Sequence, residues 1–299
     1  MRHGHQGMLL LALLLALPQV AAAQETPDLT RIEVHTPTYD AVGRRIRDDV
    51  KRLDAEGFLV GTISSTWVYG RSGRLQTSET VTMDVDGTPT HAWNSTWDYD
   101  VEGTIKVVHR TRTDGAGHVF EREREKWTRE PGALTTIVET EVNDGDGVLL
   151  RTRYQVIEDG PDGLLIGRDV STFDATGAQS FRRLERWFRT GRQVSVVERW
   201  TFDTQDEPIR HEVADWIRDE KGRVVAVDTG IFDGEETLTG FTHEVRVFHP
   251  RNRRQTSRTL TWTDADDLPL RKMTEEIAYN EDGRVITRRV RWEHWGLDD

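Results

Sequence analysis

Turn signals recur along this chain at a nearly constant spacing, and this regularity is the strongest constraint on its fold. Between residues 73 and 283 most intervals between successive signals are 14 to 16 residues. A strand of about ten residues plus a short turn fills such an interval, whereas helices joined by loops need longer units. The signals are Gly73, Gly87, Gly103, Gly117, Gly132, Gly147, Gly163, Gly177, Gly191, Asp206, Gly222, Gly234, Asn252, Asp267 and Gly283.

Many of these signals close a four-residue unit that begins with Asp or Asn, as in Asp100 to Gly103 and Asn280 to Gly283. The Asp or Asn side chain caps the start of a type I turn, and Gly adopts the left-handed conformation that follows. We therefore predict an all-β fold, an antiparallel meander of roughly 14 to 16 strands from about residue 58 onward, linked by Asp-x-x-Gly turns. Such a sheet must curl, close on itself or split into two layers.

Aromatic residues stand at fixed offsets before several turns. With Gly as position zero, position −4 lies across from position +2, which pairs Tyr99 with Ile105. Tryptophans two residues earlier share the face of these residues. We predict one dry aromatic face, with charged residues on the opposite face. Its aromatics form either packed core or a platform for sugars or acyl chains, and are Trp67, Tyr69, Trp97, Tyr99, Trp200, Phe202 and Trp216.

The segment before the sheet predicts a different structure. Val42, Ile46, Val50 and Leu53 are spaced like the apolar face of an amphipathic helix, and Gly57 follows them. We predict a short helix within residues 38–53. The run from Tyr39 to Gly43 also matches the hairpin signature, so an extra strand is the alternative.

The first 23 residues resemble a secretory signal peptide. Arg2 precedes an apolar run from Met8 to Leu17, and residues 21–23 are all alanine. The predicted organisation is a signal peptide at 1–23, an N-terminal segment at 24–57 and a repetitive β domain at 58–299. The chain has no cysteine and therefore no disulfide. We expect an exported protein, periplasmic in a bacterium, with an extracellular location as the alternative.

Charge limits the partners that this chain can have. It carries 40 basic and 52 acidic residues, interspersed, with a net charge of −12. Nucleic acid is therefore not expected as a partner. The stretch from His118 to Glu130 places charges on both faces of a strand, which a lipid-facing wall would not tolerate. We expect cross-strand Arg–Glu pairs there and no transmembrane role.

The sequence contains no recognisable catalytic motif. It has no Gly-x-Ser-x-Gly elbow, no cysteine nucleophile and no phosphate-binding loop. Its histidines lack metal-ligand spacing. The acidic run from Glu139 to Gly147 invites a calcium interpretation, but turn chemistry accounts for it. We predict no enzyme activity, no catalytic residue, no cofactor and no metal.

The repeated aromatic–acid–x–x–Gly unit resembles the tyrosine–aspartate (YD) repeat of the Rhs family. The match at Tyr279 to Val285 is close, and the others are looser. The resemblance implies a strand-and-turn architecture and an exported location, without a toxin function, since no toxin segment is recognisable. The looser copies are Tyr39-Asp40 with Gly43, Tyr99-Asp100 with Gly103, and Phe173-Asp174 with Gly177.

These observations predict an exported, non-catalytic β-repeat protein of the bacterial cell envelope that serves as a binding or scaffold module. Its expected partner is an envelope protein, a lipid or a glycan. One alternative is a periplasmic carrier of lipid or lipoprotein acyl chains, which requires a large apolar cavity. The other is a carbohydrate-binding or glycoside-active protein, which requires a groove with exposed tryptophans. A scaffold would have an interior filled by side chains.

Overall fold

A computed structural model describes residues 28–250 and 252–295 of the chain. The predicted signal peptide lies outside these residues. The described chain consists of strands joined by short loops. The strands are β1 (Asp28–Tyr39), β2 (Arg45–Leu53), β3 (Leu59–Tyr69), β4 (Leu75–Met83), β5 (Pro89–Tyr99), β6 (Ile105–Asp114), β7 (Val119–Thr128), β8 (Thr135–Asp144), β9 (Leu149–Asp159), β10 (Leu165–Asp174), β11 (Gln179–Thr190), β12 (Gln193–Phe202), β13 (Pro208–Arg218), β14 (Val224–Asp233), β15 (Leu238–Phe248), β16 (Gln255–Asp264), β17 (Pro269–Tyr279) and β18 (Val285–His294).

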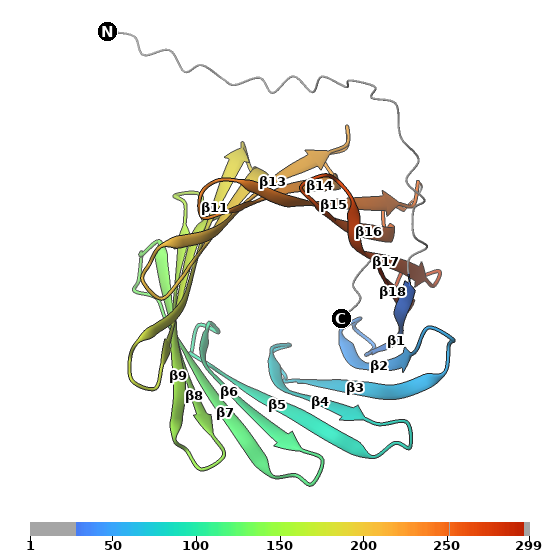
Figure 1. The fold of residues 1–299 in the computed structure, drawn as a ribbon. Helices are drawn as coiled ribbons and strands as arrows, with labels where there is room; N and C mark the ends of the chain where they lie inside the picture. The colour runs from blue at the N-terminus through green and yellow to red at the C-terminus, as the bar shows by residue number, and fades with distance from the viewer. Residues whose placement is uncertain (1–27, 251, 296–299) are drawn as a thin grey trace, which may run out of the picture.

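The strands form one closed 18-stranded antiparallel barrel. Each strand pairs with the next one along the chain, and β1 also pairs with β18, for example Val34 opposite Arg289. Figure 1 shows the resulting ring. The predicted antiparallel meander is therefore confirmed. Of the three ways in which such a sheet can cover a face, this chain closes on itself and so removes both sheet edges.

The predicted helix within residues 38–53 is wrong, and no helix occurs in the described part of the chain. The segment forms the hairpin of β1 and β2, with exposed Val42 at its tip. Only Val50 of the supposed apolar helical face is deeply buried, since it lies opposite His35 on β1. A helix here would remove β2 and leave β1 and β3 each without one of its two neighbouring strands, so closure of the barrel outweighs the local spacing.

The loops use backbone conformations that suit short hairpins. In the loop after β5, Asp100 Oδ1 accepts hydrogen bonds from the backbone N–H groups of Glu102 and Thr104 at 3.0 and 2.8 Å. Gly103 has φ 89°. In the loop after β14 the left-handed residue is Glu236, with φ 61°, and not Gly234. This shift explains why the sequence intervals on either side of Gly234 are irregular.

The two ends of the barrel differ in the face that the pre-turn residue occupies. Tyr99, four residues before Gly103, lies on the same face as Trp97, whose cross-strand partner is Val108. Phe202, four residues before Asp206, lies on the opposite face to Arg199. Successive hairpins of a meander are related by a two-fold axis that lies in the plane of the sheet. Residues at equivalent positions before turns at opposite ends of the barrel therefore lie on opposite faces of the sheet. The structural repeat is therefore two strands, about twice the turn spacing.

A contact between neighbouring hairpins recurs with this two-strand repeat, and we call it the tyrosine staple. The Tyr99 hydroxyl donates a hydrogen bond of 2.7 Å to the backbone carbonyl of Leu75 in the preceding hairpin. Tyr69 and Tyr279 make the same contact across the same sequence separation. Arg74, which follows the turn glycine of the preceding hairpin, packs over the Tyr99 ring at 5.6 Å. The aromatic residue and the Gly-Arg pair thus lock one hairpin onto the next.

Replacement of Tyr99 by Phe should destabilise the barrel by about 1 kcal/mol, the typical net contribution of one hydrogen bond. The ring remains beneath Arg74, so only the hydroxyl contact is lost. Urea unfolding followed by circular dichroism measures the change. Tyr154→Phe is the matched control, because Tyr154 lies on the outward face and is 45% exposed. Equal effects of the two changes would contradict a role for the tyrosine staple.

Candidate functional site in the barrel interior

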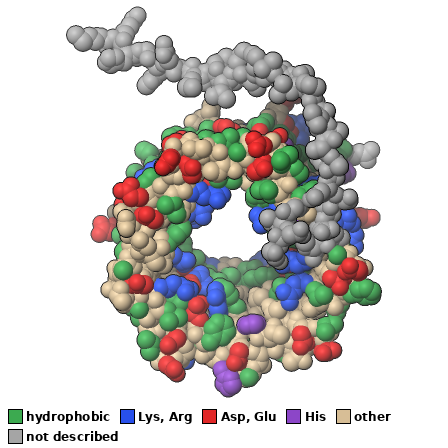
Figure 2. All heavy atoms as spheres, in the orientation of Figure 1, with side chains coloured by type: hydrophobic (Ala, Val, Ile, Leu, Met, Phe, Trp, Pro, Cys, Tyr) green, Lys and Arg blue, Asp and Glu red, His purple; other side chains and the backbone are tan. Residues whose placement is uncertain are grey.

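Every second residue of each strand faces the barrel interior. The cross-strand series Trp97, Val108, Glu125, Thr140 and Arg153 runs around the inside of five adjacent strands. The most buried side chains lie on this face, among them Val108 and Thr140 at 1% and 2% exposure. Figure 2 shows an opening through the centre of the ring, with Lys and Arg side chains around it. The interior is thus open at its centre and its wall is basic.

Arginine dominates the charge on the inward face. Lys51, Lys126 and Lys272 lie on the outward face instead. In mid-strand the inward carboxylates are Glu33, Asp48, Glu121, Glu123, Glu125, Glu185, Glu212, Glu244 and Glu275. Inward aspartates at the strand ends accept hydrogen bonds from their own turns and are Asp114, Asp144, Asp174, Asp233 and Asp264. The inward arginines are Arg31, Arg45, Arg52, Arg110, Arg112, Arg151, Arg153, Arg168, Arg183, Arg189, Arg199, Arg210, Arg218, Arg246, Arg258, Arg271 and Arg288.

Buried carboxylates anchor these arginines. Glu185 is 2% exposed, and its cross-strand neighbours on both sides are arginines, Arg168 and Arg199. The Nε atoms of Arg168 and Arg199 each donate a hydrogen bond of 2.8 Å to the Glu185 carboxylate. Arg183 Nε lies 3.3 Å from it. Each of these arginine side chains is about one third exposed whereas the Glu185 carboxylate is buried, so the interior presents positive charge here.

The same pairing recurs around the wall. Arg110 contacts both Glu123 and Glu125, and Arg112 Nη1 lies 3.3 Å from Glu121. The cross-strand Arg–Glu pairs expected for residues 118–130 are therefore present. They lie on the same face as Trp127, so the predicted separation of a dry aromatic face from a charged face is wrong. The aliphatic part and the planar guanidinium group of arginine can pack over aromatic rings, so one face of the sheet can carry both aromatic and charged side chains.

The pKa values of the buried acids follow from this pairing. Burial raises the pKa of Glu185, but the hydrogen bonds and charges of Arg199 and Arg168 outweigh it and hold that pKa below its usual value. The pKa of Glu244 is lowered in the same way by Arg258 and Arg246. These carboxylates therefore stay ionised at neutral pH, as structural counter-ions for arginine.

His35 on β1 is an inward histidine held between two carboxylates. Its Nδ1 lies 3.0 Å from Asp48 Oδ2, and Glu33 is on its other side. The interaction with Glu33, whose Oε2 lies 3.9 Å from Nε2, is the main cause that raises the pKa of His35 above its usual value, and the hydrogen bond with Asp48 adds to it. The stability that this contact adds is complete below the unfolded-state pKa of about 6.5 and is lost as the pH rises through the folded-state pKa.

Replacement of His35 by Gln should remove this pH dependence. The wild-type midpoint of urea unfolding is expected to fall more steeply than that of His35→Gln as the pH increases from about 6 to 8. Replacement of the outward-facing His243 by Gln provides the control for loss of an imidazole. Parallel profiles for wild type and His35→Gln would contradict the assignment.

The structure divides the predicted aromatics between the two faces. Trp67, Tyr69, Trp97, Tyr99 and Trp216 face inward, as their registers show. Trp200 and Phe202 face outward, where Trp200 stacks on His211 at 4.7 Å. The two outward residues precede a turn at the other end of the barrel, which reverses their face.

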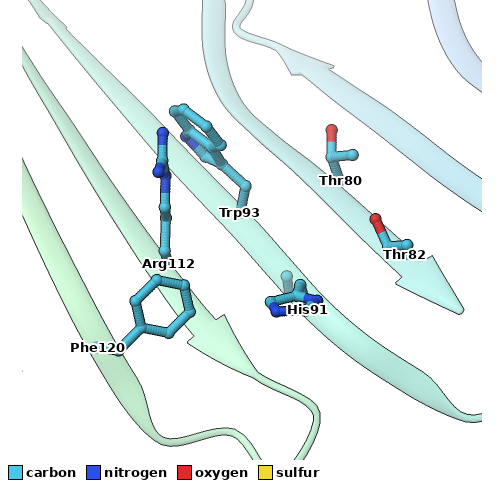
Figure 3. A pocket seen from close by; sticks show the side chains of 7 residues that line it. Thr80, Thr82, His91, Trp93, Arg112 and Phe120 are labelled. Carbon is cyan, nitrogen blue, oxygen red and sulfur yellow. The ribbon is translucent and has the colours of Figure 1, made fainter. Parts of the chain in front are cut away.

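Sequence reasoning missed a hollow on the inward face of β4 to β7. Trp93, 37% exposed, lies directly across from Arg112, whose guanidinium carbon is 3.9 Å from the ring centroid. His91 and Phe120 close one end with edge-to-face rings 6.3 Å apart. Thr80, Thr82 and Ala92 complete the lining of this space of about 270 Å³ (Figure 3). No local sequence signal marks Arg112, because its role depends on the cross-strand pairing with Trp93.

A second hollow has related chemistry. Arg271 packs over Trp262 at 3.9 Å and near Trp292 at 5.6 Å, and the two indoles are 6.1 Å apart. Arg31 and His294 help to line the space of about 390 Å³ beside them. Both hollows lie near the end of the barrel where β5 and β17 begin. They repeat one local arrangement, an arginine stacked on a tryptophan across two strands.

Within residues 28–250 and 252–295, no group of three or more His, Cys, Asp and Glu side chains is placed to hold a metal ion. In the acidic run from Glu139 to Gly147, Asp144 Oδ1 instead accepts hydrogen bonds from the backbone of its own turn. Over the same ranges no helix is long and apolar enough to cross a membrane.

Comparison with known proteins yields structural neighbours only. No protein-family model and no curated protein matches the chain. A porin-like protein from Bacteroides uniformis has a TM-score of 0.38 at 12% identity, over 88% of this chain and 95% of that one. A porin-like protein from Bacteroides vulgatus has a TM-score of 0.30 at 6% identity, over 89% and 98%. A TcdB2-TccC3-TEV structure has a TM-score of 0.15 at 10% identity, over 84% of this chain and 22% of that one. None of these assigns a family, and the YD-repeat resemblance stays a prediction.

Proposed function

We propose that this protein is an exported, non-catalytic β-barrel of the bacterial cell envelope that works surrounded by water and binds a partner through its interior. Export rests on the predicted signal peptide. The interior role rests on the open centre of the barrel and on its wall of arginine and tryptophan. The absence of an enzyme activity remains part of this proposal.

The outward face carries the argument for an aqueous setting. Arg124, Glu139, Glu198 and Asp228 lie near the middles of their strands and face outward. At the midplane of a bilayer one lipid-facing Arg or Lys costs about 2–4 kcal/mol. Such charges occur on many strands around the ring, so a lipid environment would be strongly unfavourable. In water they add solubility, and Lys126 and Glu139 pair at 3.6 Å.

The interior also bears on the competing functions. An acyl-chain carrier needs a largely apolar cavity, whereas Lys and Arg side chains lie around this opening in Figure 2 and the strand registers place many arginines on the inward face. A plain scaffold would have its interior filled by side chains, whereas Figure 2 shows a passage. An interior that is open, basic and partly aromatic favours a binding module for an anionic partner.

The aqueous setting is tested by purification without detergent. We expect the protein, expressed with its own N-terminus in a bacterium, to be recovered in the periplasmic extract and to give a single β-rich species. On flotation with phospholipid vesicles it should remain at the bottom of the gradient. Recovery only with detergent, or flotation with neutral vesicles, would refute the proposal.

A further inference from the structure

We propose that the hollow formed by Trp93 and Arg112 on the inward face binds an acidic sugar unit of a glycan chain. The inference rests on the proposed function of the interior as a binding surface. It adds the class of ligand and the position at which recognition occurs.

The side chains of the hollow match the parts of such a sugar. The Trp93 ring offers a flat apolar face, of the kind that packs against the C–H face of a pyranose. Thr80 and Thr82 supply hydroxyl groups for sugar hydroxyls. Arg112 supplies a planar cation for a carboxylate, and stacking on Trp93 holds its guanidinium in one plane.

Arg112 retains capacity for a ligand. Its side chain is 34% exposed, and the nearest described carboxylate, Glu121, is 3.3 Å from Nη1. Glu121 is shared with Arg151, whose Nη2 lies 3.2 Å from the other carboxylate oxygen. One acid thus serves two arginines, which leaves net positive charge at the mouth of the hollow. An uncharged sugar would leave this charge without a partner.

The second hollow favours a polymer over a single small anion. Arg271 and Trp262 repeat the 3.9 Å stack of Arg112 and Trp93 at the same end of the barrel. No described carboxylate forms an ion pair with Arg271. Repeated acidic units along one chain could occupy both positions, with the basic wall between them. A long nucleic acid is disfavoured by the net charge of −12 for the whole chain.

The proposal is tested with trigalacturonic acid as the probe, in isothermal titration and tryptophan fluorescence on the detergent-free barrel. Maltotriose is the neutral sugar control and inorganic tripolyphosphate is the anion control. We expect binding of trigalacturonic acid that is weakened about tenfold or more by Arg112→Gln, since a hydrogen bond to a charged group is lost. Trp93→Val should weaken it by a similar factor. Arg124→Gln removes a charge from the outward face of β7 and should leave binding unchanged.

Each outcome has a defined meaning. Unchanged affinity in Arg112→Gln, with the fold verified by circular dichroism, would overturn the location. If Arg112→Gln fails to fold, Arg112→Lys keeps the charge without the planar fork and is expected to bind more weakly than wild type. Equal binding of maltotriose or of tripolyphosphate would overturn the acidic-sugar assignment. No binding by a folded, detergent-free barrel would overturn this inference and leave the proposed aqueous setting intact.

Discussion

Deletion of β1, residues 28–39, is expected to abolish the discrete closed barrel. The strand is paired on both sides, with β2 and with β18, so its loss removes two ladders and exposes two sheet edges. Unpaired edges recruit strands from other chains. We expect light scattering after size exclusion to give a mass well above that of the full chain, together with loss of a cooperative thermal transition.

The control for this deletion is Thr36→Ser, which changes an outward side chain of β1 and preserves both ladders. It should behave as wild type. A deletion variant with the mass and the melting temperature expected of an intact barrel would show that β1 does not close the sheet.

Replacement of Glu185 by Ala is expected to cost about 3 kcal/mol in unfolding free energy, the lower end of the range for removal of one partner from a buried ion pair. The carboxylate is 2% exposed and is the common acceptor for Arg168 and Arg199. Without it, three guanidinium groups face one another across neighbouring strands. Because these groups are partly exposed, water should relieve some of the repulsion.

Two further variants distinguish charge from packing at this position. Glu185→Gln keeps the shape and one acceptor oxygen, so it should fall between wild type and Glu185→Ala. Glu198→Ala removes an outward carboxylate from β12 and should change the free energy by no more than about 0.5 kcal/mol. Denaturant unfolding measures all three. If Glu185→Ala is as mild as Glu198→Ala, the buried acid does not organise the arginines.

The sequence was sufficient to predict the strands because their lengths follow from turn chemistry. Asp100 and Gly103 show why, since one side chain and one left-handed residue define a hairpin locally. The sixteen strands that follow residue 58, β3 to β18, agree with the predicted number. Closure depended on pairing between β1 and β18, which lie at opposite ends of the described chain, and no local signal specifies such a contact.

The site was harder to predict because the side chains of a strand alternate between the two faces of the sheet. A strand assigned to the wrong face therefore has its inward and outward residues exchanged. Phe202 was grouped with Tyr99 from their equal offsets before a turn, but their turns are at opposite ends of the barrel. The helix prediction failed for a related reason. Val50 belongs to a strand whose burial depends on its neighbours and not on helical spacing. Arg112 carries no distinguishing signal until its partner Trp93 is known.

The central claim is that the chain closes into a barrel through β1 and β18, and a cross-link tests it most directly. The natural chain has no cysteine, so Val34→Cys with Arg289→Cys introduces one defined pair at opposed positions of the two strands. Cross-strand neighbours lie within the span of a disulfide. Mild oxidation should form an intramolecular bond in nearly all molecules, whereas Val34→Cys with Tyr154→Cys should form none. Failure of the first pair to link within one chain, or linkage only between chains, would contradict the closed barrel.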